Sequence, residues 1–79
     1  MVNTAMLRGK IVERGLDVPR VAERMGVDRS TLYRRIADGD TFTIGEASKI
    51  TEILGLSHEE AVAIFLASKS HNVRLLDRG

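Results

Sequence analysis

The sequence predicts a single all-α domain of five short helices. Apolar residues recur at intervals of three and four, which is the spacing of one face of a helix. Four glycines, at positions 15, 26, 39 and 55, each follow such a stretch, and helices commonly end at such a residue. Helix-capping residues precede most of the stretches, and no alternating run typical of strands appears before the tail. A chain of 79 residues is the size of one domain.

Local signals bound the first three helices. The first is expected from Asn3 or Thr4 to Arg14. The second begins after Asp17, which is a good N-cap, and tolerates Pro19 in its first turn. The third follows the capping residue at position 28 and runs to about position 37.

Two capping boxes open the remaining helices. Thr43 with Glu46 opens the fourth, and Ser57 with Glu60 opens the fifth, which is expected to reach about Ser68. The helical domain is therefore assigned to residues 1–70. Residues 71–79 form a tail that is either frayed or a short strand around 73–76, and it is a candidate dimerisation element.

Helical spacing also predicts the buried side chains. On the fifth helix, Val62, Phe65 and Leu66 are expected to face inward, and Ile64 is expected to point the opposite way. The predicted core comprises Leu7, Ile11, Val21, Met25, Leu32, Ile36, Ile50, Leu54 and Phe65.

Composition excludes several classes of function. The chain has no cysteine, so disulfides and thiolate metal sites are ruled out, and His58 and His71 lack the further ligands that a metal needs. No nucleophile–base pair or phosphate-binding loop is recognisable, so we expect neither an enzyme nor a cofactor nor a small-molecule ligand. No apolar run approaches the ~20 residues of a membrane span. We expect a cytoplasmic, nucleoid-associated protein, in a bacterial cell or a phage-infected host.

Charge is divided unevenly along the chain. Residues 1–39 carry eight Lys and Arg against five Asp and Glu, a balance of +3, whereas residues 40–79 carry four against six, a balance of −2. An anionic partner would therefore meet the N-terminal half.

The segment from 18 to 37 has the features of two helices joined by a tight turn. Ala22 supplies a small residue where the helices touch, and Gly26 supplies a turn residue that adopts positive φ. Stepping 100° per residue from an inward Leu32 turns Ser30 and Arg34 directly outward. A face of hydroxyl, guanidinium and phenol groups suits the major groove of DNA, whose base edges offer many acceptors.

This arrangement resembles the helix-turn-helix of the lambda-repressor/Cro-like family of phage and bacterial regulators. The likeness is carried by Ala22, Gly26, Val27 and the run from Arg29 to Leu32, and the helix count extends it over about residues 4–68. The family often has glutamine or serine at the start of the second helix, where this chain has Val18 and Pro19.

The resemblance implies a sequence-specific, DNA-binding transcription regulator, most simply a repressor of the phage Cro or immunity-repressor type. It assigns base reading to Arg29, Ser30, Tyr33 and Arg34. Candidate phosphate contacts are Arg20, Thr31, Arg35, Thr41 and Thr43. Two alternatives stay open: an antitoxin-like protein-binding module with auxiliary DNA binding, and a recombination accessory factor that bends DNA.

A homodimer on a palindromic operator is expected, because one recognition helix spans only a few base pairs. A helix that is apolar nearly all round, as the fifth is, is usually covered on both sides. The tail could instead fold back over Ile64 within one chain. The candidate dimer residues are Ile64, Ala67, Val73, Leu75 and Leu76.

Overall fold

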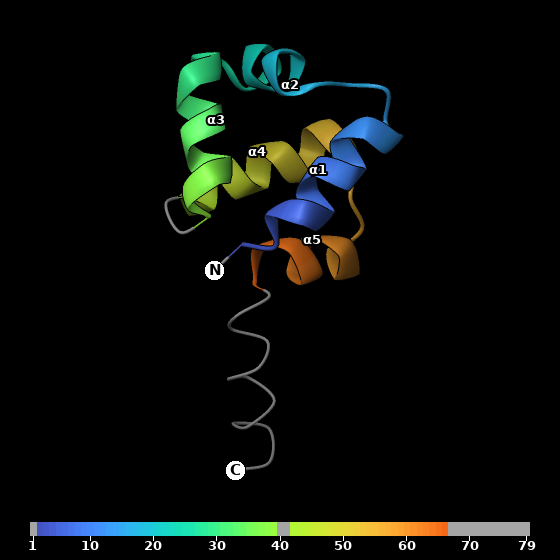
Figure 1. The fold of residues 1–79 in the computed structure, drawn as a ribbon. Coiled ribbons are helices and arrows are strands. Elements are labelled where there is room, and N and C mark those ends of the chain that lie inside the picture. The colour runs from blue at the N-terminus through green and yellow to red at the C-terminus, as the bar shows by residue number, and fades with distance from the viewer. Residues whose placement is uncertain (1, 40–41, 67–79) are drawn as a thin grey trace.

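The computed structural model describes residues 2–39 and 42–66. Five helices form in these ranges: α1 (Thr4–Glu13), α2 (Val18–Met25), α3 (Arg29–Asp38), α4 (Ile44–Leu54) and α5 (His58–Phe65). The predicted all-α fold is confirmed, since these ranges contain no strand. In Figure 1, α4 runs through the middle of the molecule, with α2 at one end and α5 at the other. The predictions for Thr41, Ala67 and the tail at 71–79 lie outside the described residues.

The N-terminal ends of the helices follow the predicted caps, with one exception. The side chains of Asn3 and Asp17 each accept a hydrogen bond from a backbone N–H of the following turn. Both capping boxes are complete, at Thr43 for α4 and at Ser57 for α5. Asp28 stands at the N-cap position of α3, but its side chain makes no capping hydrogen bond.

The core confirms most of the predicted burial. A single cluster contains Leu7, Ile11, Val21, Ala22, Met25, Leu32, Ile36, Ile50, Leu54 and Ile64. Of the predicted core residues, only Phe65 lies outside this cluster. It is partly buried, and its ring packs edge-on against Phe42 at a centroid distance of 5.8 Å. Among the described residues, no helix is long and apolar enough to cross a membrane.

The predicted orientation of α5 is wrong. Ile64 is completely buried, whereas Leu66, which was expected to face inward, is 43% exposed. The backbone N–H of Asn3 donates to the Ile64 carbonyl at 2.7 Å, so the N-terminal segment lies beside this part of α5. α5 presents apolar residues on several sides, and the docking of α1 and the N-terminal segment selected the face that is buried. Ile64 is therefore a core residue and is not available to a dimer interface.

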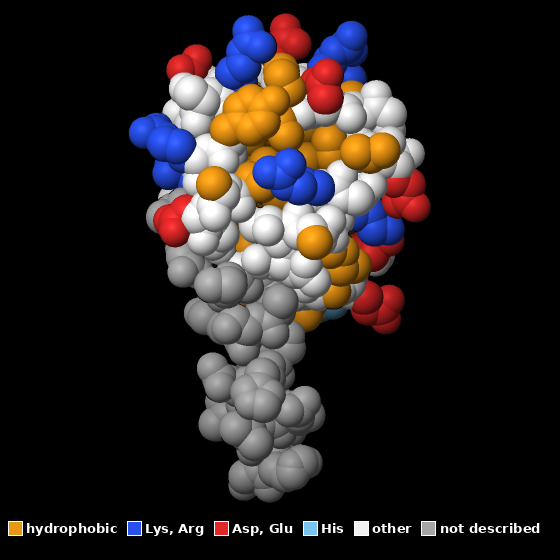
Figure 2. Space-filling view, in the orientation of Figure 1, with side chains coloured by type: hydrophobic (Ala, Val, Ile, Leu, Met, Phe, Trp, Pro, Cys, Tyr) orange, Lys and Arg blue, Asp and Glu red, His pale blue; other side chains and the backbone are white. Residues whose placement is uncertain are grey.

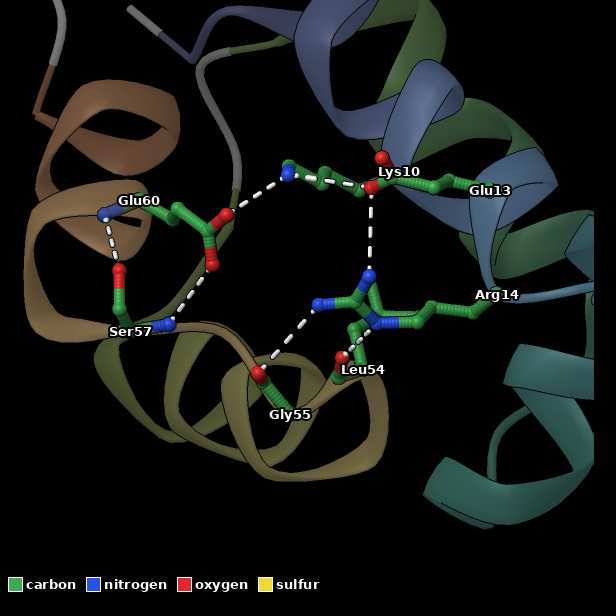
Figure 3. Close-up of polar contacts among 7 residues, drawn as sticks. All are labelled: Lys10, Glu13, Arg14, Leu54, Gly55, Ser57 and Glu60. Atoms are coloured by element: carbon green, nitrogen blue, oxygen red, sulfur yellow. Dashed lines mark hydrogen bonds and ion pairs between the residues drawn. The ribbon is translucent and has the colours of Figure 1, made fainter.

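A polar network fastens α1 to α4 and α5 (Figure 3). Lys10 donates to the Glu60 carboxylate at 2.7 Å, in the first turn of α5. Arg14 caps the C-terminal end of α4. Its Nε donates to the Leu54 carbonyl at 2.7 Å, and its Nη2 donates to the Gly55 carbonyl at 3.5 Å. A cation at the C-terminal end of α4 satisfies carbonyls that have no partner within the helix.

Candidate nucleic-acid interface

α2, the turn and α3 form one locally determined unit. Gly26 has φ +77°, a left-handed conformation that costs glycine little because it lacks a Cβ. Its N–H donates to the Glu23 carbonyl at 3.1 Å, and the N–H of Val27 donates to the Ala22 carbonyl at 3.0 Å. These two bonds are the pair that ends a helix at such a glycine. They end α2 and turn the chain into α3 between Met25 and Arg29.

The α2–turn–α3 unit is anchored on the rest of the fold. Ala22 is 1% exposed, on a helix that packs against both α3 and α4. Lys49 of α4 donates to the Met25 carbonyl at 3.3 Å, at the last residue of α2. This contact was not predicted, because nothing in the sequence around Lys49 indicates which carbonyl lies within its reach.

The predicted register of α3 is confirmed. Leu32 and Ile36 are 1% and 2% exposed, and they hold α3 in the core. The four residues predicted to read bases, Arg29, Ser30, Tyr33 and Arg34, all have exposed side chains. Their exposure leaves one face of α3 open to a partner while the opposite face is buried.

The exposed face of α3 carries two arginines, Arg29 and Arg34. Among the described residues, the side chains of Arg29 and Arg34 have no partner in a hydrogen bond or an ion pair. Ser30 differs from them, since its hydroxyl donates to the Asp28 carboxylate at 3.0 Å. A hydroxyl with its proton engaged in this way still has lone pairs to accept a second bond.

Tyr33 lies at the edge of a shallow groove between α3 and α1. The groove is lined by Arg8, Ile11, Val12, Leu16, Asp17, Val18 and Tyr33. The tyrosine is 45% exposed, so its ring faces partly toward α1 and partly toward solvent. Figure 2 shows apolar side chains gathered on this side of the molecule around a basic side chain.

The predicted phosphate-contacting residues fall into different environments. Arg20 is exposed on α2, and Thr31 is half-buried. Thr43 is occupied as the N-cap of α4, because its Oγ1 accepts the Glu46 N–H at 3.0 Å. Arg35 is paired with the Glu46 carboxylate. These residues are therefore not equally available to donate to a phosphate, since Thr43 and Arg35 already have partners.

Glu46 has two roles in this region, and only one of them could be predicted from the sequence. Its role in the capping box was predicted, but its contact with Arg35 was not. Burial raises the pKa of Glu46, and hydrogen bonds from Arg35 and the Thr43 backbone lower it by more, so the net shift is downward. The carboxylate is accordingly ionised at neutral pH.

Comparison with known families agrees with this geometry. A family model described as helix-turn-helix, HTH_3, matches residues 7–60, a range that includes the whole of α2 and α3. No match was found among curated proteins or among solved structures. The family match covers more than half of the chain, and the fold and the predicted motif agree with it. The chain belongs to the lambda-repressor/Cro-like helix-turn-helix family and is a DNA-binding transcription regulator.

Proposed function

We propose that this protein is a sequence-specific repressor of the phage Cro or immunity-repressor type, which reads the major groove of double-stranded DNA with α3. The observation that carries the proposal is the pair of guanidinium groups of Arg29 and Arg34, which have no partner within residues 2–39 and 42–66 and lie on the exposed face of the second helix of the motif. Arginine pairs with the O6 and N7 acceptors of guanine through two parallel hydrogen bonds. Such a repressor would act on the nucleoid, in the cytoplasm of a bacterial cell or a phage-infected host.

Four side chains are proposed to read bases. Arg29 stands in the first turn of α3, where a side chain reaches past the helix end. Ser30 and Arg34 lie on the face opposite the buried Leu32, and Tyr33 flanks them. Because Tyr33 also lines the groove toward α1, its contact with DNA would use the exposed part of the ring.

Phosphate contacts are proposed for side chains bordering this face. Arg20 is an exposed cation on α2, and Thr31 is on the first turn of α3. Thr43 already serves as an N-cap, so a phosphate would share its hydroxyl with the helix. A phosphate contact by Arg35 requires its ion pair with Glu46 to open.

A homodimer on a palindromic operator is part of the proposal. Two copies related by a two-fold axis would place their α3 helices about 34 Å apart, in successive major grooves on one side of the duplex. The burial of Ile64 means that the contact between copies must use another surface. Sedimentation of the free protein and of its operator complex tests this, and a single copy in both would contradict it.

The decisive experiment is binding to the DNA upstream of the protein's own gene. A mobility-shift titration at several salt concentrations, followed by footprinting, would locate a protected site, and a reporter fused to that site should be repressed by the protein. Binding that is equal on the upstream region and on random duplex would contradict sequence-specific repression. A large bend at the site would favour a DNA-bending factor, and stable co-purification with the product of a neighbouring gene would favour an antitoxin-like module.

A further inference from the structure

Two consecutive arginines near the end of α3 differ in exposure and in pairing. Arg34 is exposed and has no partner among the described residues. Arg35 is half-buried, and its guanidinium contacts both carboxylate oxygens of Glu46 on α4. Its Nε lies 3.1 Å from Oε1 and 3.2 Å from Oε2, and its Nη2 lies 3.2 Å from Oε2. Side-chain exposures of 29% for Arg35 and 17% for Glu46 mean that both charges are partly withdrawn from water.

The Glu46 carboxylate is held on its other side as well. Its Oε1 also accepts the Thr43 backbone N–H at 3.0 Å, in the capping box that starts α4. Donors from the end of α3 and from the start of α4 therefore converge on one carboxylate. A forked pair of this kind fixes direction as well as distance, because guanidinium and carboxylate are both planar.

This pairing changes how many cations the DNA-binding face offers. Binding to DNA releases counterions in proportion to the number of phosphates that protein cations neutralise. A guanidinium already neutralised by a carboxylate adds little to that number unless its partner is released. While it stays paired with Glu46, Arg35 therefore strengthens neither specific nor non-specific binding through its charge.

We propose that Glu46 is a positioning residue that keeps Arg35 away from the DNA phosphates and uses its guanidinium to fix the angle of α3 on α4. This proposal rests on the proposed function, since it concerns the same DNA-binding face. Withholding Arg35 lowers the affinity for any phosphate backbone and leaves base reading by Arg34 intact. Because phosphate contacts do not depend on sequence, this lowers operator and random-DNA affinity by the same factor, and the base contacts of Arg34 carry a larger share of the binding free energy.

The test is the salt dependence of binding, measured with the full chain on an operator duplex and on a random duplex of equal length. Arg35→Gln should leave the slope of log K against log salt unchanged within about 0.3, because no phosphate contact is lost. Glu46→Gln keeps an oxygen that can accept the Thr43 N–H but removes the charge that holds Arg35. It should steepen the slope by about 0.9 per bound subunit and tighten binding to both duplexes several-fold.

Two further variants complete the design. The double variant Arg35→Gln with Glu46→Gln should return the slope to the wild-type value, because the released cation is then absent. Arg20→Gln, which removes a proposed phosphate contact from an exposed site, should flatten the slope by about 0.9 per subunit and calibrates the measurement. A flattening of that size in Arg35→Gln, or an unchanged slope in Glu46→Gln, would overturn the proposal. If Glu46→Gln is unfolded at the assay temperature, Arg35→Gln alone decides.

Thermal unfolding separates this proposal from the proposed function. If the wild-type chain binds no duplex in a salt-dependent manner, the proposed function fails. The positioning role is still tested by melting temperatures, because a coupled pair predicts that the double variant loses less than the sum of the two single variants. Strict additivity would show that Arg35 and Glu46 do not hold α3 on α4.

Discussion

Lys10 Nζ lies 2.7 Å from Glu60 Oε2, and this ion pair joins α1 to the first turn of α5. The other carboxylate oxygen of Glu60 accepts the Ser57 backbone N–H at 2.9 Å. The hydrogen bond from Lys10, followed by the one from Ser57, lowers the pKa of Glu60 to about 2, against a smaller opposing effect of burial. One side chain thus serves both the cap of α5 and the docking of α1.

Acid should therefore weaken the fold through Glu60. Its pKa is lower in the folded than in the unfolded chain, so its contribution is present above the unfolded value of about 4.5 and is lost as the pH falls toward 2. Urea denaturation from pH 6 to pH 2 should show the free energy of unfolding falling across this window. Glu60→Gln, which retains an acceptor for Ser57, should flatten that fall, and parallel curves for the two proteins would contradict the assignment.

Leu32→Ala should destabilise the domain by about 2–4 kcal/mol, through lost transfer free energy and the cavity that is left. Leu32 is 1% exposed, and it anchors α3 from the buried side. Urea denaturation monitored by circular dichroism measures the loss. Val12→Ala, at a position that is 73% exposed, is the control and should change stability by no more than about 0.5 kcal/mol. Similar values for the two variants would mean that α3 is not held by this face.

Ile64→Asp should prevent folding. The side chain is 0% exposed, and an unpaired carboxylate there would cost more than a domain of roughly 5 kcal/mol stability can lose. The orientation predicted from sequence, with Ile64 facing outward, would instead leave the fold intact. Ile44→Asp is the matched control, because Ile44 is 90% exposed at the start of α4, where a carboxylate is favourable. A folded Ile64→Asp protein, judged by its amide NMR spectrum, would restore the sequence-based orientation of α5.

Gly26→Ala should cost about 1–2 kcal/mol, because an L-residue is strained at φ +77°. A Cβ at this position meets nothing within 4 Å, so the cost comes from the backbone alone. Gly9→Ala is the matched control. Gly9 lies within α1 and its Cβ also meets nothing, so alanine there should stabilise the protein by about 1 kcal/mol through its higher helix propensity. Opposite shifts in melting temperature are expected, and a neutral Gly26→Ala would show that the turn relaxes.

Arg34→Ala should reduce specificity more than affinity for DNA in general. Loss of a bidentate guanine contact is expected to cost about 1–3 kcal/mol on the operator and much less on a random duplex. Fluorescence anisotropy titrations on both duplexes measure the two losses. Equal losses would reassign Arg34 to a phosphate contact.

Helix boundaries and the motif were determined by short stretches of sequence. The capping boxes at Thr43 and Ser57 and the turn at Gly26 act within three or four residues, so their outcome hardly depends on the rest of the fold. The register of α3 was equally readable, because Leu32 and Ile36 are the only large aliphatic side chains on that helix. A polar helix with one apolar stripe has only one face that it can bury.

Tertiary packing decided which face of α5 is buried and which arginine of α3 is paired, because the local sequence pattern left both open. α5 has apolar residues on several sides, and contact with the N-terminal segment and α1 selected Ile64 for burial. Arg34 and Arg35 are identical and adjacent in the sequence, yet within the described part of the chain the Glu46 carboxylate, eleven residues beyond Arg35, pairs with Arg35 and not with Arg34. Local sequence can specify which groups lie on a helix, but the partner that each charge or apolar face meets depends on how the helices dock. That docking involves residues too distant in the chain for any local pattern to reveal.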